Sequence, residues 1–284
     1  MSFDPRLLPA RPDLAARHLQ GKVEAARFVD GKRHQVIDAQ APVRHAPAPD
    51  AALATEALMG EIFTIYETTE EGFAWGQLET DGYVGWLPAN SLGASGPAPT
   101  HRVAVLRTLL FPGPSIKLPP LAAPSLGARL SIVREQERFA VTAAGGYVPA
   151  LHLAPIGSFE ADFVAVAERF RGAPYLWGGK TSLGLDCSGL VQVSLQAGGL
   201  PAPRDADLQE QALGIAIEPA AAGADLRRGD LLFWPGHVAI VRNRDTLVHA
   251  NAFHMMTEIE PIPDAIARIR AAGSELTSVR RLPA

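Results

Sequence analysis

The chain has one cysteine, Cys187, so neither an intramolecular disulfide nor a cysteine-rich zinc cluster can hold any part of it together. The remaining chemical role for this residue is that of a nucleophile. Gly184 lies upstream as a turn residue, and residues 187–197 have the apolar spacing of a helix. The free N–H groups and the macrodipole at a helix N-terminus would stabilise a thiolate. A buried structural cysteine is the alternative.

Composition is that of an ordinary globular protein with room for several domains. Of the 284 residues, 47% are apolar and 20% are charged. A run of about 18 apolar residues, as a membrane span requires, is absent from the sequence. The net charge of −4 offers no basic surface for nucleic acid. The first residues lack the features of a secretory signal, so we expect a cytoplasmic protein, with a periplasmic or secreted location still open.

Residues 1–30 are expected to form an arm that packs on the rest of the chain. Prolines interrupt its first part, and Pro12-Asp13 then opens an apparent helix over residues 14–28. We identify no chemical motif in this segment.

Residues 31–157 contain a diverged internal repeat. The matching segments are 60–67 with 127–134, 72–75 with 138–141, and 82–87 with 146–151. Each copy has short alternating strands separated by turn residues, which predicts a small all-β barrel of about 60 residues. We expect the first barrel at 31–96 and the second, more diverged one at 97–157, with Pro97 and Pro99 between them.

Residues 158–284 are predicted to form an α+β domain. An amphipathic helix over 159–171 precedes the cysteine helix, and strands are predicted over 230–234, 237–241 and 246–250. Helices followed by strands favour an α+β fold over a doubly wound sheet.

Two histidines belong to neighbouring predicted strands. If these strands pair symmetrically about Asn243, His237 faces His249 directly, with Cβ atoms about 4.5–5.5 Å apart. This register needs a loop of odd length, because a two-residue turn would send His249 to the opposite face. A zinc site built from Cys187, His237 and His249 is the competing interpretation. One thiolate with two imidazoles is an uncommon catalytic zinc set, so we expect no metal and no other cofactor.

Six segments of the C-terminal half resemble, in order, the motifs of NlpC/P60 cysteine peptidases. They are Tyr175-Leu176-Trp177-Gly178-Gly179, Leu185-Asp186-Cys187-Ser188-Gly189-Leu190, Pro203-Arg204-Asp205-Ala206-Asp207-Leu208-Gln209, Arg228-Gly229-Asp230-Leu231-Leu232-Phe233, Gly236-His237-Val238-Ala239-Ile240 and Leu247-Val248-His249-Ala250. Residues 82–87 resemble the end of a bacterial SH3 domain. Bacterial SH3 domains ahead of an NlpC-type domain make the chain similar to the YkfC-like members of the family. The resemblance implies a papain-like catalytic domain at 158–284 after two SH3-like barrels.

The resemblance also implies a role for each residue of a triad. Cys187 would be the nucleophile, His237 the general base, and His249 the residue that orients His237. Tyr175 would lie near the nucleophile and contact the oxyanion, together with the backbone N–H of Cys187.

Substrate-binding residues follow from the same resemblance. Asp186 and Ser188 flank the nucleophile, and Asp186 would pair with a substrate ammonium group, serve as a helix N-cap, or do both. Arg204 matches a family position in a loop. In YkfC-like relatives the first SH3 domain closes the far end of the cleft, so Glu61 and Tyr83 are candidates to bind the substrate amine. Otherwise they are ordinary surface and core residues.

The implied activity is that of an endopeptidase for peptidoglycan stem peptides. It would hydrolyse the bond between γ-D-glutamate and a diamino acid, prefer a free N-terminal L-Ala, and act in muropeptide recycling. The implied partner is the peptide L-Ala-γ-D-Glu-diamino acid. Two alternatives stay open: another cysteine amidase or acyltransferase on the same fold, and a catalytically idle protein that binds the cell wall.

Overall fold

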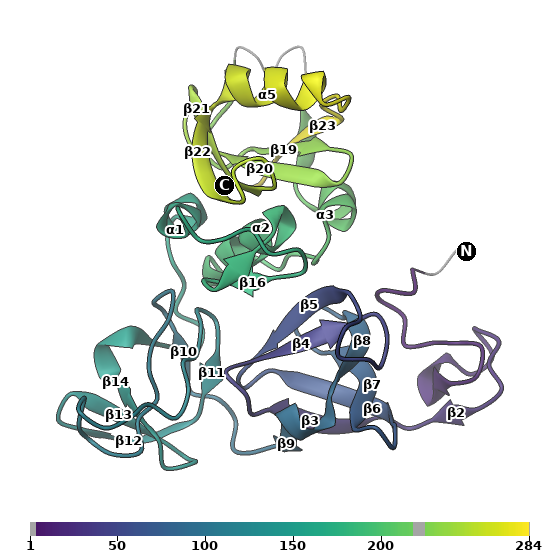
Figure 1. The fold of residues 1–284 in the computed structure, drawn as a ribbon, viewed down its shortest axis with the longest axis vertical. Helices are drawn as coiled ribbons and strands as arrows, with labels where there is room; N and C mark the ends of the chain where they lie inside the picture. The colour runs from purple at the N-terminus through teal and green to yellow at the C-terminus, as the bar shows by residue number, and fades with distance from the viewer. Residues whose placement is uncertain (1–3, 218–224, 284) are drawn as a thin grey trace. The chain divides into compact units, whose positions relative to one another are not determined.

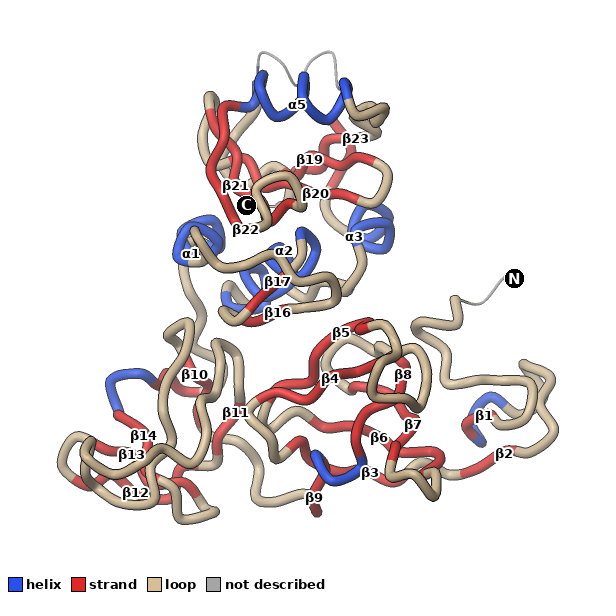
Figure 2. The backbone as a smooth tube through the Cα atoms, viewed as in Figure 1, coloured by secondary structure: helices blue, strands red, loops and turns tan. Residues whose placement is uncertain are grey.

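The computed structural model describes residues 4–217 and 225–283, which divide into two compact units, Met1–Ile156 and Gly157–Ala284. Figure 1 shows the ribbon with its element labels, and Figure 2 shows that strands dominate the N-terminal unit while α-helices belong to the C-terminal one. Among the described helices, none combines the length and the apolar character needed to cross a membrane.

The N-terminal arm has two short strands where the sequence predicted a helix. Strand β1 (Ala15–Ala16) pairs in parallel with β2 (Phe28–Val29), and the 3₁₀ helix η1 (Arg17–Leu19) lies between them. The helix predicted over residues 14–28 is therefore wrong. Leu14 and Leu19 are buried, whereas Val23 and Phe28 are buried only in part.

The arm docks through one leucine and one arginine. Leu14 is fully buried against Trp75 and Trp86. The Arg11 guanidinium lies 4.4 Å from the Trp75 ring centroid and 5.0 Å from that of Trp86, a cation–π arrangement. These two tryptophans are thus core aromatics under the arm.

The first all-β copy is an antiparallel sheet with the strand order β5-β4-β8-β7-β6-β3-β9. Its elements are β3 (Lys32–Val36), β4 (Gln40–Arg44), β5 (Leu53–Leu58), β6 (Ile62–Thr68), β7 (Phe73–Leu78), β8 (Val84–Pro88), η2 (Ala89–Ser91) and β9 (Leu92–Ala94). Phe63, Leu78 and Leu87 come from three different strands and are fully buried in one core. Side chains on a strand alternate between its two faces, so the sheet can bury an apolar set on one side.

The second copy repeats this order of elements. After β10 (His101–Val103) and β11 (Arg129–Leu130) come β12 (Ile132–Gln136), β13 (Phe139–Thr142), β14 (Tyr147–Pro149), η3 (Ala150–His152) and β15 (Leu153–Pro155). The last five correspond to β6, β7, β8, η2 and β9, in agreement with the predicted repeat. Here the strands form two sheets, β11-β10-β15 and β12-β13-β14.

The C-terminal unit is built around a sheet with the order β18-β23-β19-β20-β21-β22. The sheet strands are β18 (Ile215–Ile217), β19 (Leu231–Trp234), β20 (His237–Val241), β21 (Thr246–Asn251), β22 (Met256–Pro261) and β23 (Ser278–Arg281). The short strands β16 (Lys180–Thr181) and β17 (Gly184–Leu185) pair with each other in a separate sheet of the same unit. Its helices are α1 (Phe163–Arg169), α2 (Cys187–Ala197), α3 (Ala206–Ala212) and α5 (Ile262–Ala271). Mixed helices and sheet confirm the predicted α+β class.

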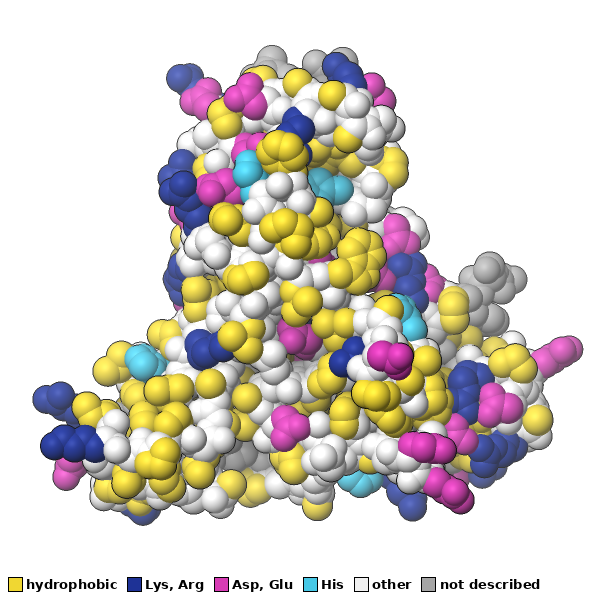
Figure 3. Space-filling model, viewed as in Figure 1, with side chains coloured by type: hydrophobic (Ala, Val, Ile, Leu, Met, Phe, Trp, Pro, Cys, Tyr) yellow, Lys and Arg dark blue, Asp and Glu magenta, His cyan; other side chains and the backbone are white. Residues whose placement is uncertain are grey.

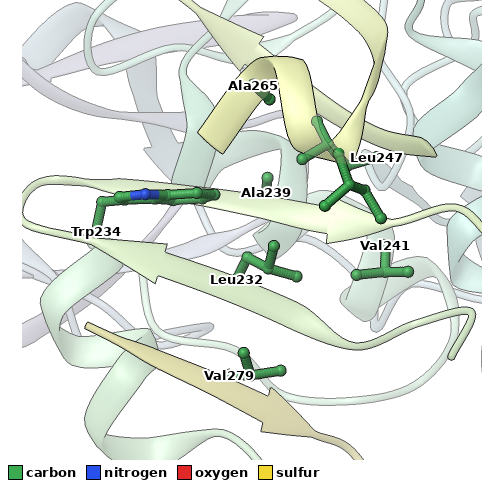
Figure 4. Packing of buried hydrophobic residues seen from close by; sticks show 8 residues of the cluster. Leu232, Trp234, Ala239, Val241, Leu247, Ala265 and Val279 are labelled. Atoms are coloured by element: carbon green, nitrogen blue, oxygen red, sulfur yellow. The ribbon is translucent and has the colours of Figure 1, made fainter. Parts of the chain in front are cut away.

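Helices lie against both faces of the central strands. Helix α2 contacts β20 and β21, and α5 packs on the sheet through a separate apolar cluster. Figure 4 shows that cluster, with Ala265 of α5 above Leu232, Ala239 and Leu247 of the sheet. Strand β20 is accordingly buried on both faces after its first residue.

Helices α1 and α2 can be compared with the helices predicted from the sequence. Residues 187–197 form α2 as predicted. Helix α1 is shorter than the predicted 159–171, because Asp162 caps it: its carboxylate accepts hydrogen bonds from the N–H groups of Val164 and Ala165 at 2.9 and 3.2 Å.

Alanine substitutions at two glycines of the N-terminal unit can test how tightly its two β copies pack. Gly60 and Gly72 have positive φ angles of 84° and 85°, but a Cβ would lie 2.0 Å from the Arg129 carbonyl oxygen at Gly60 and in open space at Gly72. We expect Gly72→Ala to lower the free energy of unfolding by about 1–2 kcal/mol through backbone strain. Gly60→Ala should cost clearly more, because the second copy must also move. Urea denaturation of both variants measures this, and equal losses would contradict the packing.

Candidate active site

The candidate nucleophile lies at the N-terminus of α2. Cys187 is the first residue of the helix and is 5% exposed. The preceding residue, Asp186, is the N-cap, and its Oδ1 accepts a hydrogen bond from the Gly189 N–H at 2.7 Å. An aspartate in this position satisfies one of the free N–H groups of the first turn, which explains why the helix begins at Cys187.

A buried ion pair holds that cap in place. Arg204 is fully buried and donates to Oδ1 and Oδ2 of Asp186 at 2.9 and 2.8 Å. It also donates to Ser188 Oγ at 2.9 Å and to the Gly179 carbonyl at 3.2 Å, while the Gly178 N–H donates to Asp186 Oδ2 at 2.8 Å. Buried charges need such complete pairing.

The same contacts bear on the expected substrate-binding residues. Asp186 acts as the N-cap, and Arg204 balances its charge inside the protein. Ser188 Oγ donates to Asp186 Oδ1 at 3.2 Å. All three residues therefore support the position of Cys187, and their direct contact with a substrate stays a prediction.

The Cys187 thiol is buried beside the start of β20. Its Sγ lies 4.0 Å from the Gly236 carbonyl oxygen, beside the backbone that carries His237. Burial, together with the negative charge of Asp186, raises the pKa of the thiol to about 12, although the N–H groups of Val238 and Ser188 act in the opposite direction. Desolvation therefore outweighs the expected effect of the helix N-terminus on the pKa of the thiol.

The two candidate histidines share a hydrogen bond. His237 Nε2 lies 2.9 Å from His249 Nδ1, and the ring centroids are 5.1 Å apart. Both side chains thus lie on the same face of the sheet, as the sequence predicted.

The register that brings them together differs from the predicted one. Strands β20 and β21 pair Ile240 with Val248 and Val241 with Leu247. The turn is therefore centred one residue later than Asn243, and the two histidines are diagonal neighbours instead of direct partners. The predicted direct pairing is wrong, but a shift of two positions keeps both side chains on one face.

A carboxylate extends the histidine pair. His249 Nε2 lies 2.6 Å from Glu260 Oε2, and Arg268 donates to the same oxygen. Sequence reasoning missed both residues because β22 and α5 were not predicted. The available signal was the alternation of Glu258 and Glu260 in a short extended segment after His249.

These contacts bear on the zinc interpretation. Both ring nitrogens of His249 are already engaged, one by His237 and one by Glu260. Within residues 4–217 and 225–283, no group of three histidine, cysteine or acidic residues is arranged to hold a metal ion.

The imidazole of His237 is also neutral at rest. Burial, together with the neighbouring His249, lowers its pKa to about 3. A neutral ring can accept a proton at neutral pH without first losing one. The Cys187 thiol, with its raised pKa, and the His237 imidazole, with its lowered pKa, are thus both uncharged at pH 7.

The backbone of Tyr175 pairs with that of Leu185, two residues before Cys187. Burial raises the pKa of Tyr175, and the neighbouring Cys187 and Asp186 add to the effect, so the hydroxyl stays protonated and can donate a hydrogen bond. Its N–H donates to the Met255 carbonyl at 2.9 Å, which ties it to the loop between β21 and β22. Contact with an oxyanion stays a prediction.

The surface beside Tyr175 is partly apolar. Trp177, Phe253 and Met255 are 66%, 68% and 59% exposed. Figure 3 shows hydrophobic and histidine side chains together on the visible face of the C-terminal unit.

The two candidates of the first β copy are buried. Glu61 is 3% exposed, and its Oε2 accepts a hydrogen bond from the Leu58 N–H at 2.6 Å. Tyr83 is 2% exposed. Their part in substrate binding stays a prediction.

The neutral thiol has a measurable consequence. We expect the rate of Cys187 alkylation by iodoacetamide to rise about tenfold per pH unit between pH 7 and 10, because only the thiolate reacts and the pKa of the thiol is about 12. Free cysteine, with its pKa of about 8.5, is the reference and should level off within this range. A rate that is flat between pH 5 and 9 would instead reveal a thiolate–imidazolium pair.

Two segments of the chain match known domain families. Residues 43–92 match the bacterial dipeptidyl-peptidase SH3 domain, and residues 172–267 match the NlpC/P60 family.

Curated relatives cover these segments to different extents. The γ-D-glutamyl-L-lysine dipeptidyl-peptidase of Bacillus subtilis is 27% identical over 257 residues, which cover 82% of either chain. The enzyme of the same name from Bacillus cereus is 25% identical over 241 residues, covering 74% of this chain and 71% of the relative. Dipeptidyl-peptidase 6 of Lysinibacillus sphaericus is 38% identical over 94 residues, so the match spans 33% of that relative's length.

A solved structure shares the fold of nearly the whole chain. An NlpC/P60 family protein from Bacillus cereus superimposes with a TM-score of 0.73 at 21% identity, covering 89% of this chain and 100% of that one. The protein therefore combines a bacterial SH3 domain with an NlpC/P60 peptidase domain.

Proposed function

We propose that the protein is a cysteine endopeptidase that hydrolyses the bond between γ-D-glutamate and a diamino acid in peptidoglycan stem peptides. Cys187 is the nucleophile, His237 the general base and His249 the residue that orients His237. The observation that carries this proposal is the 2.9 Å hydrogen bond from His237 Nε2 to His249 Nδ1, next to a buried cysteine at a helix N-terminus.

Attack begins from the neutral pair. As the Cys187 Sγ approaches the carbonyl carbon, its proton passes to the His237 ring nitrogen that is not bonded to His249, which is Nδ1. The new C–S bond places negative charge on the carbonyl oxygen. The backbone N–H of Cys187, in the first turn of α2, and the Tyr175 hydroxyl are the proposed donors to that oxygen.

Collapse of this intermediate releases the diamino acid. The C–N bond breaks, and the imidazolium of His237 returns its proton to the leaving amine. The L-Ala-γ-D-glutamyl group stays on Cys187 as a thioester. Water then attacks the thioester, gives a proton to His237, and the free carboxylic acid leaves as the thiol is restored.

The substrate class rests on the relatives. Two of them, covering most of this chain, are named γ-D-glutamyl-L-lysine dipeptidyl-peptidases. A third, 37% identical over 94 residues, is named γ-DL-glutamyl hydrolase, which also acts at a γ-glutamyl bond by its name. We further propose a preference for a free N-terminal L-Ala and a role in muropeptide recycling in the cytoplasm. Cell fractionation tests the compartment.

The nucleophile is tested by Cys187→Ala with the free tripeptide L-Ala-γ-D-Glu-L-Lys and its diaminopimelate counterpart. Wild-type enzyme should release L-Ala-γ-D-Glu and the diamino acid, detected by mass spectrometry. The variant should lose turnover by several orders of magnitude, and more than about a hundredth of wild-type activity would contradict the mechanism. Ser194→Ala is the matched control, because Ser194 is fully buried in the same helix and its Oγ has no hydrogen-bond partner in the described structure.

Substrate choice separates the remaining possibilities. The N-acetylated tripeptide should be cleaved much more slowly than the free one if a free L-Ala is required. Turnover of N-acetylmuramoyl peptides in place of the tripeptides would indicate another cysteine amidase. No turnover of any of them, with binding to intact cell wall, would indicate a wall-binding protein.

A further inference from the structure

Glu260 connects the histidine pair to helix α5. It lies near the end of β22, and its Oε2 is 2.6 Å from His249 Nε2. Arg268, on the next element of the chain, donates to the same oxygen. The His249 side chain is fully buried, and those of Glu260 and Arg268 are 12% and 23% exposed. The contact is therefore largely shielded from solvent, and dissolved salt screens it only weakly.

The charge states at this contact are well defined. Burial acts to raise the pKa of Glu260, but the hydrogen bonds from His249 and Arg268 prevail and lower it to about 2. Burial lowers the pKa of His249, although Glu260 acts in the opposite direction. At neutral pH a carboxylate thus faces a neutral imidazole.

These charge states determine which nitrogen of His249 carries its proton. A carboxylate only accepts hydrogen bonds, so His249 Nε2 must be protonated and donate to Glu260. A neutral imidazole has one N–H, so His249 Nδ1 is a bare acceptor. His237 Nε2 must then carry a proton and donate to it. Because His237 is also neutral, its Nδ1 is left bare.

Without the carboxylate the histidine pair would have two equivalent arrangements. In the reverse arrangement His249 Nδ1–H donates to a bare His237 Nε2, and His237 Nδ1 carries the proton. That ring could not accept the Cys187 proton at Nδ1. The hydrogen bond between the rings is satisfied in both cases, so a group outside the pair must distinguish them, and the Glu260 carboxylate beyond His249 is placed to do so.

We propose that Glu260, held by Arg268, is a positioning residue that imposes the Nε2–H tautomer on His249 and, through it, on His237. This inference rests on the proposed function of His237 as the base. The carboxylate contacts His249, and the rings of His249 and His237 separate it from the thiol.

Other charged groups around His249 fit this assignment. His237 faces it from β20, Glu260 from β22 and Arg268 from α5, while His254 Nδ1 lies 3.9 Å from Glu260 Oε2. Arg268 is also covered by Phe253, with its guanidinium 4.5 Å from that ring centroid. The guanidinium keeps the carboxylate ionised and directed at His249.

The direct test is the tautomer of each ring in the full-length resting enzyme, read from long-range ¹H–¹⁵N NMR spectra of the imidazoles. Wild-type protein should show His237 and His249 with protonated Nε2 and bare Nδ1. A protonated Nδ1 on His249 would overturn the proposal. This readout needs no turnover, so a wild-type enzyme that cleaves no γ-D-glutamyl peptide would contradict the proposed function and leave this inference standing.

Glu260→Met removes the acceptor while keeping the length of the side chain. We expect mixed tautomers on both rings and a loss in kcat of about 10- to 100-fold with little change in KM, the range known for carboxylate partners of metal-bound histidines. The double variant Glu260→Met/Arg268→Met gives the same readout without an unpaired guanidinium, in case the single variant does not fold. Unchanged tautomers in either folded variant would overturn the proposal.

Glu258→Met is the matched control. Glu258 lies on the same strand, and its carboxylate pairs with Arg171 at 2.8 Å instead of contacting a histidine ring. This variant removes an ion pair of β22 and should leave the tautomers and kcat unchanged. An equal change in Glu258→Met and Glu260→Met would show that any loss of an ion pair from this strand disturbs the rings, which would overturn the specific role of Glu260.

Discussion

The position of Cys187, the proposed nucleophile, depends on the buried carboxylate of Asp186. It caps α2, accepts a hydrogen bond from the Gly178 N–H, and forms an ion pair with the fully buried Arg204. A carboxylate in the interior is costly unless its charge is balanced and its oxygens are hydrogen-bonded, and this one meets both conditions. Removal of Arg204 would leave that charge unpaired beneath Cys187. The two sequence motifs that contain Asp186 and Arg204 are thus parts of one structural contact.

The sheet supplies the other half of the site. Cys187 Sγ lies against the backbone around Gly236, where β20 begins, and His237 directs its ring toward His249. Because α2 packs on β20 and β21, the helix N-terminus and the histidine pair are held by the same packing. The burial that accompanies this packing also raises the pKa of the thiol and lowers that of His237. A neutral resting pair then makes the choice of tautomer important, because the base must present a bare nitrogen.

Local signals in the sequence predicted the main elements of the site, and long-range pairing accounts for most of what they missed. The apolar spacing after Cys187 and the strand patterns around His237 and His249 correspond to α2, β20 and β21. The face shared by the histidines depends only on the parity of the register, so it was predictable. The exact pairing depends on the turn, which Asn243 alone does not determine.

Two errors have clear physical causes. The arm was predicted to be helical from apolar spacing, but its Leu14 is buried by the first sheet, which the local pattern cannot reveal. The helix N-terminus was expected to lower the pKa of the thiol, but the depth of burial, which raises that pKa, is a property of the folded state. Glu260 was missed for the same reason, because its contact with His249 depends on the pairing of β21 with β22.

The central claim is that an acyl group passes through Cys187, and the most direct measurement is to trap that group. Full-length enzyme is mixed with L-Ala-γ-D-Glu-diaminopimelate, quenched in acid during turnover, digested and analysed by mass spectrometry. The account predicts an L-Ala-γ-D-glutamyl thioester on the peptide that contains Cys187. Continued release of the diamino acid by enzyme fully alkylated at Cys187 would contradict it.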